Sequence, residues 1–335
     1  MKVLRLHAPG DLRLHDEPEP KPAPGEVLVR VGAVGLCGSD RHWVVEGAIG
    51  DAVLERPLVL GHEFAGTIAA GPRAGERIAL DPADPCGRCA TCAAGLEHLC
   101  PETRFAGHGG TDGALRPLLA WPERLVHSLP PSVPDAEAPL LEPLGVALHA
   151  LELGQVAAGT RAGVFGCGPI GLLLVQALRA AGATTVVTTD PHEHRRAAAA
   201  AFGAECSAHP EELACSWDAA ELDVAFEAVG DDGALADAIA LVRPGGRIVL
   251  VGIPEGDRTC FEAAAARRKE VTLACCRRMT AGDLVRAIGL AERGAVDLAA
   301  VVGERHPLAR WEVAFAALVE QRTLKVLVEL QEAGS

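Results

Sequence analysis

The hydrophobic pattern changes near residue 146, and the change predicts two kinds of domain. Up to residue 145, short runs such as EVLVRVGAVG (26–35) and GTIAAGPRAGERIAL (66–80) alternate apolar residues with small or polar ones. Proline- and glycine-rich segments separate these runs, a pattern typical of short strands joined by turns. Because no long helical period stands out in this part, we expect a mainly β domain.

From about residue 145 onward, helix-like and strand-like periods alternate. Residues 145–156 have the pattern of a helix, and residues 161–190 have that of a strand, a glycine-rich turn, a helix and a second strand. The pattern continues with a helix at 195–204, a strand at 222–230, a helix and turn at 233–246 and a strand at 247–252. Strands that alternate with helices of about 10–15 residues indicate βαβ units and a parallel sheet.

The C-terminal part is expected to return to the first domain. AGDLVRAIGLAERGAV and RWEVAFAALVEQR, both after about residue 278, have the period of amphipathic helices, and LKVLVEL (324–330) predicts a closing strand. The pattern therefore predicts an α/β protein with a mainly β domain at 1–147 plus 278–335. Residues 148–277 would form a doubly wound domain around a parallel sheet.

Composition argues against several classes of function. The 335 residues suffice for about two domains, and 49% of them are hydrophobic, enough for sizeable cores. The formal net charge of -14 argues against nucleic acid or an anionic membrane as a partner, because both need a basic surface. No run reaches the roughly 18 uninterrupted apolar residues of a membrane span, and the N-terminus lacks the apolar core of a signal peptide. We therefore expect a cytoplasmic protein.

Two counts narrow the chemistry further. Eleven cysteines in a reducing compartment favour metal-binding or catalytic roles over disulfides. The chain has no tyrosine, so a dehydrogenase that uses a catalytic tyrosine as its general acid is excluded.

A glycine-rich turn lies between the first strand and the first helix of the predicted parallel sheet. GVFGCGPIG places G-x-G-x-x-G at Gly166, Gly168 and Gly171, and the helix would begin at Pro169 and Ile170. Such glycines allow a tight turn and close approach of the backbone to a pyrophosphate, which the helix N-terminus then binds. A purely structural glycine-rich turn is the alternative interpretation.

An acidic residue follows the glycine-rich turn at the distance that dinucleotide binding requires. Asp190 stands at the end of the second strand, where its carboxylate would accept hydrogen bonds from the adenosine ribose hydroxyls. A carboxylate repels a 2′-phosphate, so Asp190 favours NAD over NADP. His192, Arg195 and Arg196 follow closely and weaken that preference, and Arg195 is itself a candidate cofactor contact.

Two short segments in the first domain offer metal ligands. VGLCGSDRHW contributes Cys37 and LVLGHEFAG contributes His62 and Glu63, while LLEPLGVALHA adds Glu142. A thiolate, an imidazole and a carboxylate can bind zinc and leave one position open for water or substrate. Each residue also has an ordinary interpretation, because a single cysteine is usually a small core residue and an HE pair usually lies at the surface.

A denser cysteine pattern occurs at CGRCATC. It has the spacing C-x2-C-x2-C-x7-C, with cysteines at Cys86, Cys89, Cys92 and Cys100. Disulfides conflict with a cytoplasmic location. From the spacing alone, an iron–sulfur cluster, a zinc site or no function remain open, although ferredoxin-type runs have a shorter step to the fourth cysteine.

Taken together, these motifs resemble those of a known family. The order GLCGSD, GHEFAG, CGRCATC, LEPL, GCGPIG and a later aspartate runs over nearly the whole chain. It resembles the zinc-dependent medium-chain dehydrogenases, and within them the sorbitol and polyol dehydrogenases. The resemblance implies a GroES-like catalytic domain and a Rossmann NAD-binding domain.

The resemblance also implies roles for individual residues. Cys37, His62 and Glu63 match the catalytic zinc ligands, with water in the fourth position, and Glu142 matches a carboxylate beside that zinc. Ser39 and His42 match the groups that carry the substrate proton away, and Asp40 matches the carboxylate that fixes the His62 tautomer. A structural zinc site that is closed to substrate is matched by the four cysteines Cys86, Cys89, Cys92 and Cys100. The resemblance therefore implies two zinc ions per chain.

The implied reaction is transfer of hydride from a secondary hydroxyl of a polyol, sugar, cyclitol or aminocyclitol to NAD. Arg277 resembles an arginine that binds polyol hydroxyls, and Phe105 and His108 lie where relatives line the pocket. Trp43 replaces a residue that is commonly tyrosine in sorbitol dehydrogenases, and Cys276 and Arg278 replace aromatic residues. These departures put sorbitol itself in doubt and leave a polyhydroxy secondary alcohol as the expected substrate.

Other interpretations remain at this point. A dehydrogenase acting on threonine or on a simple secondary alcohol fits the same motifs. A non-catalytic NAD-binding protein of the same fold, or a zinc-free quinone reductase, would be expected to lose the metal ligands that are present here. Relatives are commonly dimers or tetramers, so we expect a homodimer or homotetramer.

Overall fold

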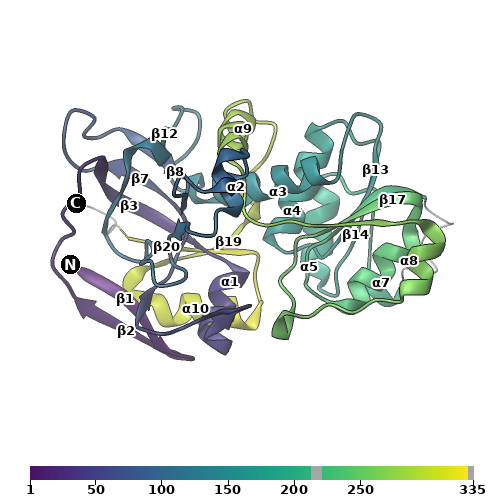
Figure 1. Ribbon diagram of the computed structural model, residues 1–335, viewed down its shortest axis with the longest axis horizontal. Coiled ribbons are helices and arrows are strands. Elements are labelled where there is room, and N and C mark those ends of the chain that lie inside the picture. Colours follow the sequence, from purple (N-terminus) through teal and green to yellow (C-terminus); the bar gives the residue numbers. More distant parts are fainter. Residues whose placement is uncertain (213–220, 331–335) are drawn as a thin grey trace. The chain divides into compact units, whose positions relative to one another are not determined.

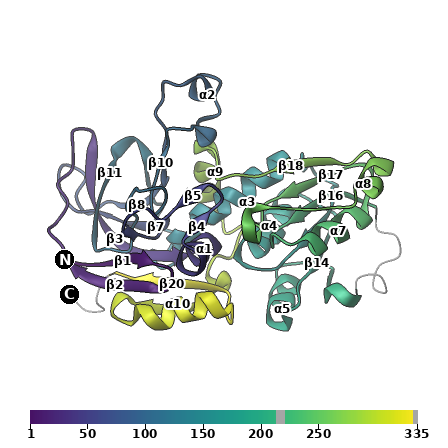
Figure 2. The same cartoon turned by 60° about the horizontal axis from the view of Figure 1, so that its bottom comes forward.

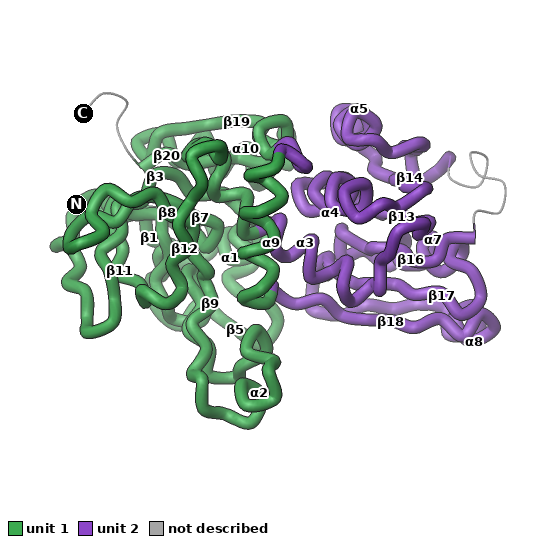
Figure 3. The backbone as a smooth tube through the Cα atoms, turned by 90° about the horizontal axis from the view of Figure 1, so that it is seen from above, with its two compact units in different colours: residues 1–142, 280–293, 298–335 green, residues 143–279, 294–297 purple. Residues whose placement is uncertain are grey.

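The computed structural model of the chain describes residues 1–212 and 221–330. Its backbone contacts divide it into two compact units (Figure 3). Unit 1 comprises Met1–Glu142, Thr280–Arg293 and Leu298–Ser335, and unit 2 comprises Pro143–Met279 and Gly294–Asp297. The C-terminal part of the chain thus contributes most of its residues to the unit that contains the N-terminus.

Unit 1 is built mainly from β-strands (Figure 1). Its largest sheet has seven strands in the order β12-β8-β7-β3-β20-β19, with β11 also paired to β3. The strands of this sheet are β3 (Glu26–Leu36), β7 (Glu63–Ile68), β8 (Arg77–Leu80), β11 (Leu118–Pro122), β12 (Val126–Ser128), β19 (Val302–Pro307) and β20 (Lys325–Glu329). The smaller sheets contain β1 (Lys2–Ala8), β2 (Asp11–Asp16) and β6 (Leu58–Val59), then β4 (Ala48–Ile49) with β5 (Ala52–Val53), and β9 (Ala83–Asp84) with β10 (Arg104–Phe105).

The apolar faces of these strands enclose the core of unit 1. Val31, Leu60, Phe64, Ile78 and Val328 are among its buried residues. The helices are α1 (Gly38–Glu46), α2 (Ala90–Ala93), α9 (Ala281–Glu292) and α10 (Trp311–Glu320), and the 3-10 turns are η1 (Glu97–Leu99), η2 (Glu123–Leu125), η3 (Ala138–Leu140), η6 (Ala299–Val301) and η7 (Leu308–Arg310). Strand β20 pairs antiparallel with β3, so a segment near the C-terminus completes the sheet that the N-terminal part begins.

Unit 2 contains a six-stranded parallel sheet in the order β15-β14-β13-β16-β17-β18. The strands are β13 (Arg161–Phe165), β14 (Thr185–Thr189), β15 (Cys206–Ala208), β16 (Leu222–Glu227), β17 (Val242–Leu250) and β18 (Thr272–Cys275). The helices are α3 (Leu141–Leu153, which begins in unit 1), α4 (Pro169–Ala180), α5 (Glu193–Ala201), α7 (Asp232–Leu241) and α8 (Ala263–Lys269), with the turns η4 (Pro210–Glu212) and η5 (Glu255–Asp257). The strand order reverses between β13 and β16, and ligands of such sheets bind at the carboxyl ends of the strands beside this point.

The parallel sheet confirms the alternating pattern of strands and helices in the sequence, with two local differences. The pattern placed a helix and turn at 233–246, but the helix ends at Leu241 and residues from Val242 already belong to β17. The pattern also missed α1, because Asp40 and His42 are buried in this helix and break its apolar period. Side-chain hydrogen bonding at the helix start, between Cys37 and Asp40, marks where α1 begins.

Across residues 1–212 and 221–330, none of the helices is both long enough and apolar enough to cross a membrane.

Candidate metal centres and cofactor-binding turn

Three candidate ligands meet at the ends of neighbouring strands in unit 1. Cys37 follows β3 and stands at the start of α1, while His62 and Glu63 lie where β7 begins. The two strands pair antiparallel, with Gly35 opposite Glu63, which brings the three side chains to one edge. One ligand atom from each residue lies within 4.8 Å of the others. His62 and Glu63 are buried, as zinc ligands in a partly closed site would be.

The electrostatics of this group favour a bound cation. Burial, followed by the nearby Glu63 carboxylate, raises the pKa of the Cys37 thiol to about 12. Burial also raises the pKa of Glu142 to about 8, and raises the pKa of Asp40. Several buried acids therefore share a space in which their anionic forms are unfavourable, and a divalent metal would stabilise those forms. The donor set of one thiolate, one imidazole and one carboxylate fits zinc.

Asp40 and Ser39 lie next to the candidate ligands. Asp40 accepts a hydrogen bond from the Cys37 backbone N–H at 2.9 Å, and its other oxygen lies 3.8 Å from Nδ1 of His62. The Ser39 hydroxyl lies 3.5 Å from Nε2 of His62. His42 does not contact these residues in any described interaction; its Nδ1 is hydrogen-bonded to the Glu46 carboxylate at 2.5 Å. Asp40 is thus placed to orient His62, and Ser39 lies beside the ligand group.

An aromatic series extends from His62 along one side of the group. The Phe105 ring lies 5.4 Å from that of His62 between ring centroids, and His108 lies 6.2 Å from Phe105. Trp43 packs edge-on against His108 at 5.3 Å and lines a cavity of about 190 Å³ together with residues 51–56. Arg277, the other expected substrate contact, is exposed and belongs to unit 2.

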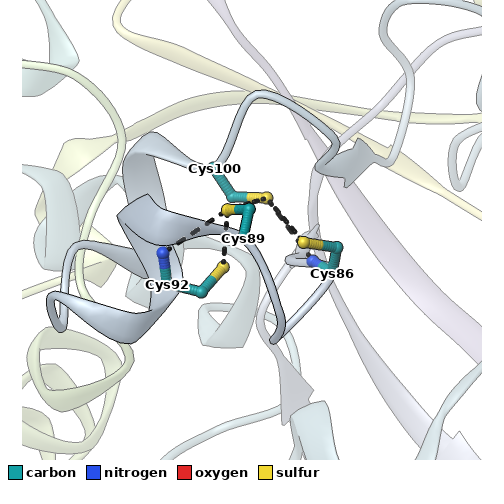
Figure 4. A group of neighbouring side chains, drawn as sticks. All are labelled: Cys86, Cys89, Cys92 and Cys100. Carbon is teal, nitrogen blue, oxygen red and sulfur yellow. Dashed lines mark hydrogen bonds between the residues drawn. The ribbon is translucent and has the colours of Figure 1, made fainter.

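The three cysteines of CGRCATC and Cys100 come together in one loop between β9 and β10. Their side chains point toward one another (Figure 4). The sulfur atoms are 3.5 Å apart for Cys89 and Cys92, 3.8 Å for Cys89 and Cys100, and 3.6 Å for Cys86 and Cys100. A disulfide would require about 2.05 Å, and all four cysteines are free. Four converging thiols at these distances fit a tetrahedral metal site with no open position.

Ion pairs attach this loop to the sheet. The loop projects from the remainder of unit 1 (Figures 2 and 3). Where it begins, the buried Asp84 accepts a hydrogen bond from Arg104 at 2.8 Å and another from Arg124. Because so few apolar residues of the loop are buried, a metal held by the four thiolates would supply much of its local stability.

The glycine-rich turn in unit 2 has the shape that a pyrophosphate needs. Gly166 has a φ of 101°, which a residue with a side chain rarely adopts, and a Cβ on Gly171 would lie 1.9 Å from the Gly166 oxygen. Gly168 has open space where a Cβ would be, and it precedes Pro169 at the start of α4. The missing side chain at Gly168 leaves room for a dinucleotide. The N–H groups at the start of α4, which includes Ile170, can donate hydrogen bonds to its pyrophosphate.

Asp190 is buried at the end of β14 and holds the turn in place. One of its oxygens accepts from the Cys167 N–H and the other from the His192 N–H, both at 2.8 Å. Nη1 of Arg195 lies 3.8 Å from the same carboxylate. A carboxylate has about four acceptor positions, so Asp190 can bind a ribose hydroxyl only in addition to these backbone contacts.

Comparison with known proteins identifies the family. The family described as Alcohol dehydrogenase GroES-like domain matches residues 23–131, and that described as Zinc-binding dehydrogenase matches residues 169–293. The chain is 33% identical to sorbitol dehydrogenase of Bacillus subtilis (strain 168) over 342 residues, which covers 98% of this chain and 97% of the relative. The chain belongs to the zinc-dependent medium-chain alcohol dehydrogenase superfamily. This confirms the family that the motif order indicated.

Solved structures of other proteins have the same fold. A protein of Sinorhizobium meliloti 1021, solved with NADP, is 28% identical with a TM-score of 0.90, and the match covers 98% of this chain and 99% of that one. An alcohol dehydrogenase of E. coli CFT073, solved with NADH, is 26% identical with a TM-score of 0.89 and the same coverage. The expected combination of a GroES-like domain with a Rossmann domain is therefore correct.

The sequence patterns did not indicate one residue that contacts the candidate metal ligands of this dehydrogenase. Lys325 lies on β20 and donates to both carboxylate oxygens of Glu63, at 2.6 and 2.7 Å. The segment LKVLVEL was interpreted only as a closing strand. A lysine within an otherwise apolar strand is an unusual choice for a buried position, and it could have indicated a buried anionic partner.

Proposed function

We propose that this chain is a zinc- and NAD-dependent dehydrogenase that oxidises a secondary hydroxyl of a polyol, sugar, cyclitol or aminocyclitol. The observation that carries the proposal is the convergence of the half-buried Cys37 with the buried His62 and Glu63, because three mixed ligands leave a position for a reacting oxygen. The similarity to a sorbitol dehydrogenase over nearly the whole chain supports a polyhydroxy substrate.

In this proposal Cys37, His62 and Glu63 hold the catalytic zinc. The metal would supply a Lewis acid that lowers the pKa of a substrate hydroxyl, and the nicotinamide would accept the hydride. Asp40 keeps the His62 ring in one orientation and one tautomer, since its carboxylate lies beside Nδ1. Glu142 lies close enough to the ligands to be perturbed by their charges, and it acts beside the metal as an acid–base group.

Proton removal is assigned to Ser39 and His42. The Ser39 hydroxyl adjoins His62 and can accept and pass on a proton from the substrate hydroxyl. His42 is buried but bonded to the partly exposed Glu46, so its imidazole connects the interior to the surface of unit 1. The two side chains would carry out separate steps of proton removal.

The second zinc is assigned a structural role. Cys86, Cys89, Cys92 and Cys100 would enclose it completely, so no substrate could reach it. Its contribution is to hold the loop between β9 and β10 in a single conformation.

The cofactor is assigned to unit 2. The carboxylate of Asp190 beside the turn at Gly166, Gly168 and Gly171 favours NAD, because a 2′-phosphate would meet a negative charge. The positive charge of Arg195 lies beside Asp190 and would allow some binding of the 2′-phosphate of NADP. Proteins of this fold have been solved with NADH and with NADP. The cofactor preference of this chain is therefore measured as the ratio of kcat/KM for NAD and NADP.

Substrate contacts and domain limits belong to the same proposal. Phe105 and Trp43 would form an apolar wall against the carbon skeleton, and Arg277 would donate to hydroxyl groups. The catalytic domain would comprise 1–147 plus 278–335 and the NAD-binding domain 148–277, which the two compact units support. Assembly as a homodimer or homotetramer is proposed from the resemblance alone.

The test is a screen for NADH formation across polyols, cyclitols, aminocyclitols, threonine and simple secondary alcohols. Zinc content is measured on the same sample. The proposal expects the highest kcat/KM for a polyhydroxy compound and about two zinc ions per chain. Highest activity on threonine or on a mono-alcohol would favour the alternative dehydrogenase. Bound NAD and zinc without turnover on any compound would favour a non-catalytic protein.

A further inference from the structure

Lys325 is locked into the metal-binding group by all of its donors. Its ammonium donates to Oε1 and Oε2 of Glu63 at 2.6 and 2.7 Å and to the Leu36 backbone oxygen at 3.1 Å. A lysine has three N–H donors, so none remains for water. The side chains of Lys325 and Glu63 are 3% and 0% exposed, which makes this a fully buried ion pair on a candidate metal ligand.

The pair depends on a missing side chain in the strand between its partners. Strand β3 lies between β20 and β7, so the Lys325 side chain must cross β3 to reach Glu63. It crosses near Gly35, where a Cβ would lie 2.1 Å from Oε2 of Glu63. The carboxylate therefore rests on the bare backbone of Gly35, with the ammonium on one side and the Cys37 and His62 ligand atoms within 4.8 Å of it.

This arrangement places a fixed positive charge and a divalent cation in competition for one carboxylate. Each Glu63 oxygen already has one of its acceptor positions filled by Lys325, and the remaining positions are available to a metal. The ammonium also reduces the net negative charge that Cys37 and Glu63 present to the metal. Coulomb interactions over a few ångströms in a buried site are strong enough for one such charge to alter metal affinity severalfold or more.

We propose that Lys325, seated over Gly35, is a positioning residue that makes Glu63 an exchangeable ligand of the catalytic metal. It holds the carboxylate in one orientation and weakens its bond to the metal, so that a coordination position can be vacated during turnover. A neutral residue at 325 would let Glu63 bind the metal as an uncompensated anion. The inference rests on the proposed function, because it assumes zinc at Cys37, His62 and Glu63.

The experiment measures zinc transfer to a chromogenic chelator from the purified full-length chain. The kinetic phase that is missing in Cys37→Ala belongs to the catalytic metal, and the remaining phase belongs to the four-cysteine loop. In Lys325→Met we expect the catalytic phase to slow by at least about tenfold, with the loop phase unchanged. Turnover should fall at the same time, since Glu63 no longer yields its position.

Two further variants separate charge from hydrogen bonding and from packing. Lys325→Gln keeps an amide donor near Glu63 without the charge. If Lys325→Met does not fold, Lys325→Gln takes its place, with the same expected slowing of the catalytic phase. Lys325→Arg keeps the charge and should release zinc at nearly the wild-type rate. Lys269→Met is the matched control, because Lys269 donates to three backbone oxygens in unit 2 and its loss should affect only stability.

The outcomes are distinct from those of the proposed function. A purely structural Lys325 predicts that its removal loosens the group, so catalytic zinc would leave as fast as, or faster than, in the wild type. That result, with zinc present in the wild type, overturns the inference alone. If the wild-type chain holds no zinc that depends on Cys37, the inference and the proposed function fail together.

Discussion

The two cysteine-containing groups of unit 1 differ in how the chain assembles them. The four-cysteine group comes from one loop, with all ligands between β9 and β10, and its spacing is visible in the sequence. The group of Cys37, His62 and Glu63 is assembled by strand pairing and receives Lys325 from a strand near the C-terminus. The conspicuous pattern thus indicates a locally closed site, while the proposed catalytic group requires the pairing of β7, β3 and β20.

The two groups also differ in their surroundings. The four sulfur atoms face one another, which leaves no ligand position to exchange. The other group is surrounded by buried carboxylates whose pKa values are raised by burial, and by the Lys325 ammonium. Such perturbed titratable groups are typical of sites where protons move. The comparison therefore supports the proposal that one group stabilises the loop and the other carries the chemistry.

The largest expected effect is on activity in Cys37→Ala. Removing the thiolate leaves two ligands, so we expect loss of about one zinc per chain and a fall in kcat/KM of at least about 10³-fold. NADH formation and zinc content are measured on the same preparation. Cys260→Ser is the control, since Cys260 is exposed and belongs to neither group. Wild-type activity in Cys37→Ala would remove this group from the mechanism.

A large effect on stability is expected in Cys89→Ser. Few apolar residues of the loop are buried, so loss of the proposed zinc should lower the free energy of unfolding by more than about 2 kcal/mol. Urea unfolding measures this change, and kcat per folded molecule should stay within about threefold of wild type. A variant that retains both zinc ions, or loses activity while folded, would contradict the division of roles.

A smaller effect is expected in Ser39→Ala. Its hydroxyl is proposed to pass on the substrate proton, so kcat should fall by about 10²-fold with zinc content unchanged. Ser39→Thr keeps a hydroxyl and should recover most of the rate. A wild-type kcat in the alanine variant would exclude Ser39 from the proton path.

The smallest effect concerns the pH dependence of the metal-free protein. Burial raises the pKa of Glu142 from 4.5 to about 8, so the folded chain holds this proton more tightly than the unfolded chain does. The resulting stabilisation is complete below about pH 4.5 and is lost as the pH rises through about 8. Urea unfolding of the chelated wild type should therefore weaken over this interval more steeply than that of Glu142→Gln. Parallel pH profiles for the two proteins would contradict this role of Glu142.

Sequence patterns predicted the framework better than the interior of the site. The G-x-G-x-x-G turn and the alternation of strands and helices depend on local backbone requirements, such as the positive φ of Gly166. These features can therefore be predicted from the sequence. Helix α1 was missed because its buried face carries Asp40 and His42 in place of apolar residues. These two polar side chains occupy buried positions of the helix, and a hydrophobic period cannot reveal them.

The other features that the sequence did not predict are contacts between segments that lie far apart in the chain. The pairing of Lys325 with Glu63 depends on the order of β7, β3 and β20 in the sheet, and on the absence of a side chain at Gly35. Neither the lysine nor the glycine has a local pattern that indicates the other. Similarly, one of the two backbone contacts that occupy Asp190 comes from Cys167, in the turn that follows β13.

The most direct test of the central claim uses a chain in which only the catalytic group can bind metal. Zinc is removed from Cys89→Ser and then added back in steps, while NADH formation from the best polyhydroxy substrate is measured. The account predicts that activity returns in proportion to added zinc and reaches its plateau at about one zinc per chain. Failure of activity to return while the chain stays folded, with zinc bound at Cys37 and His62, would contradict it.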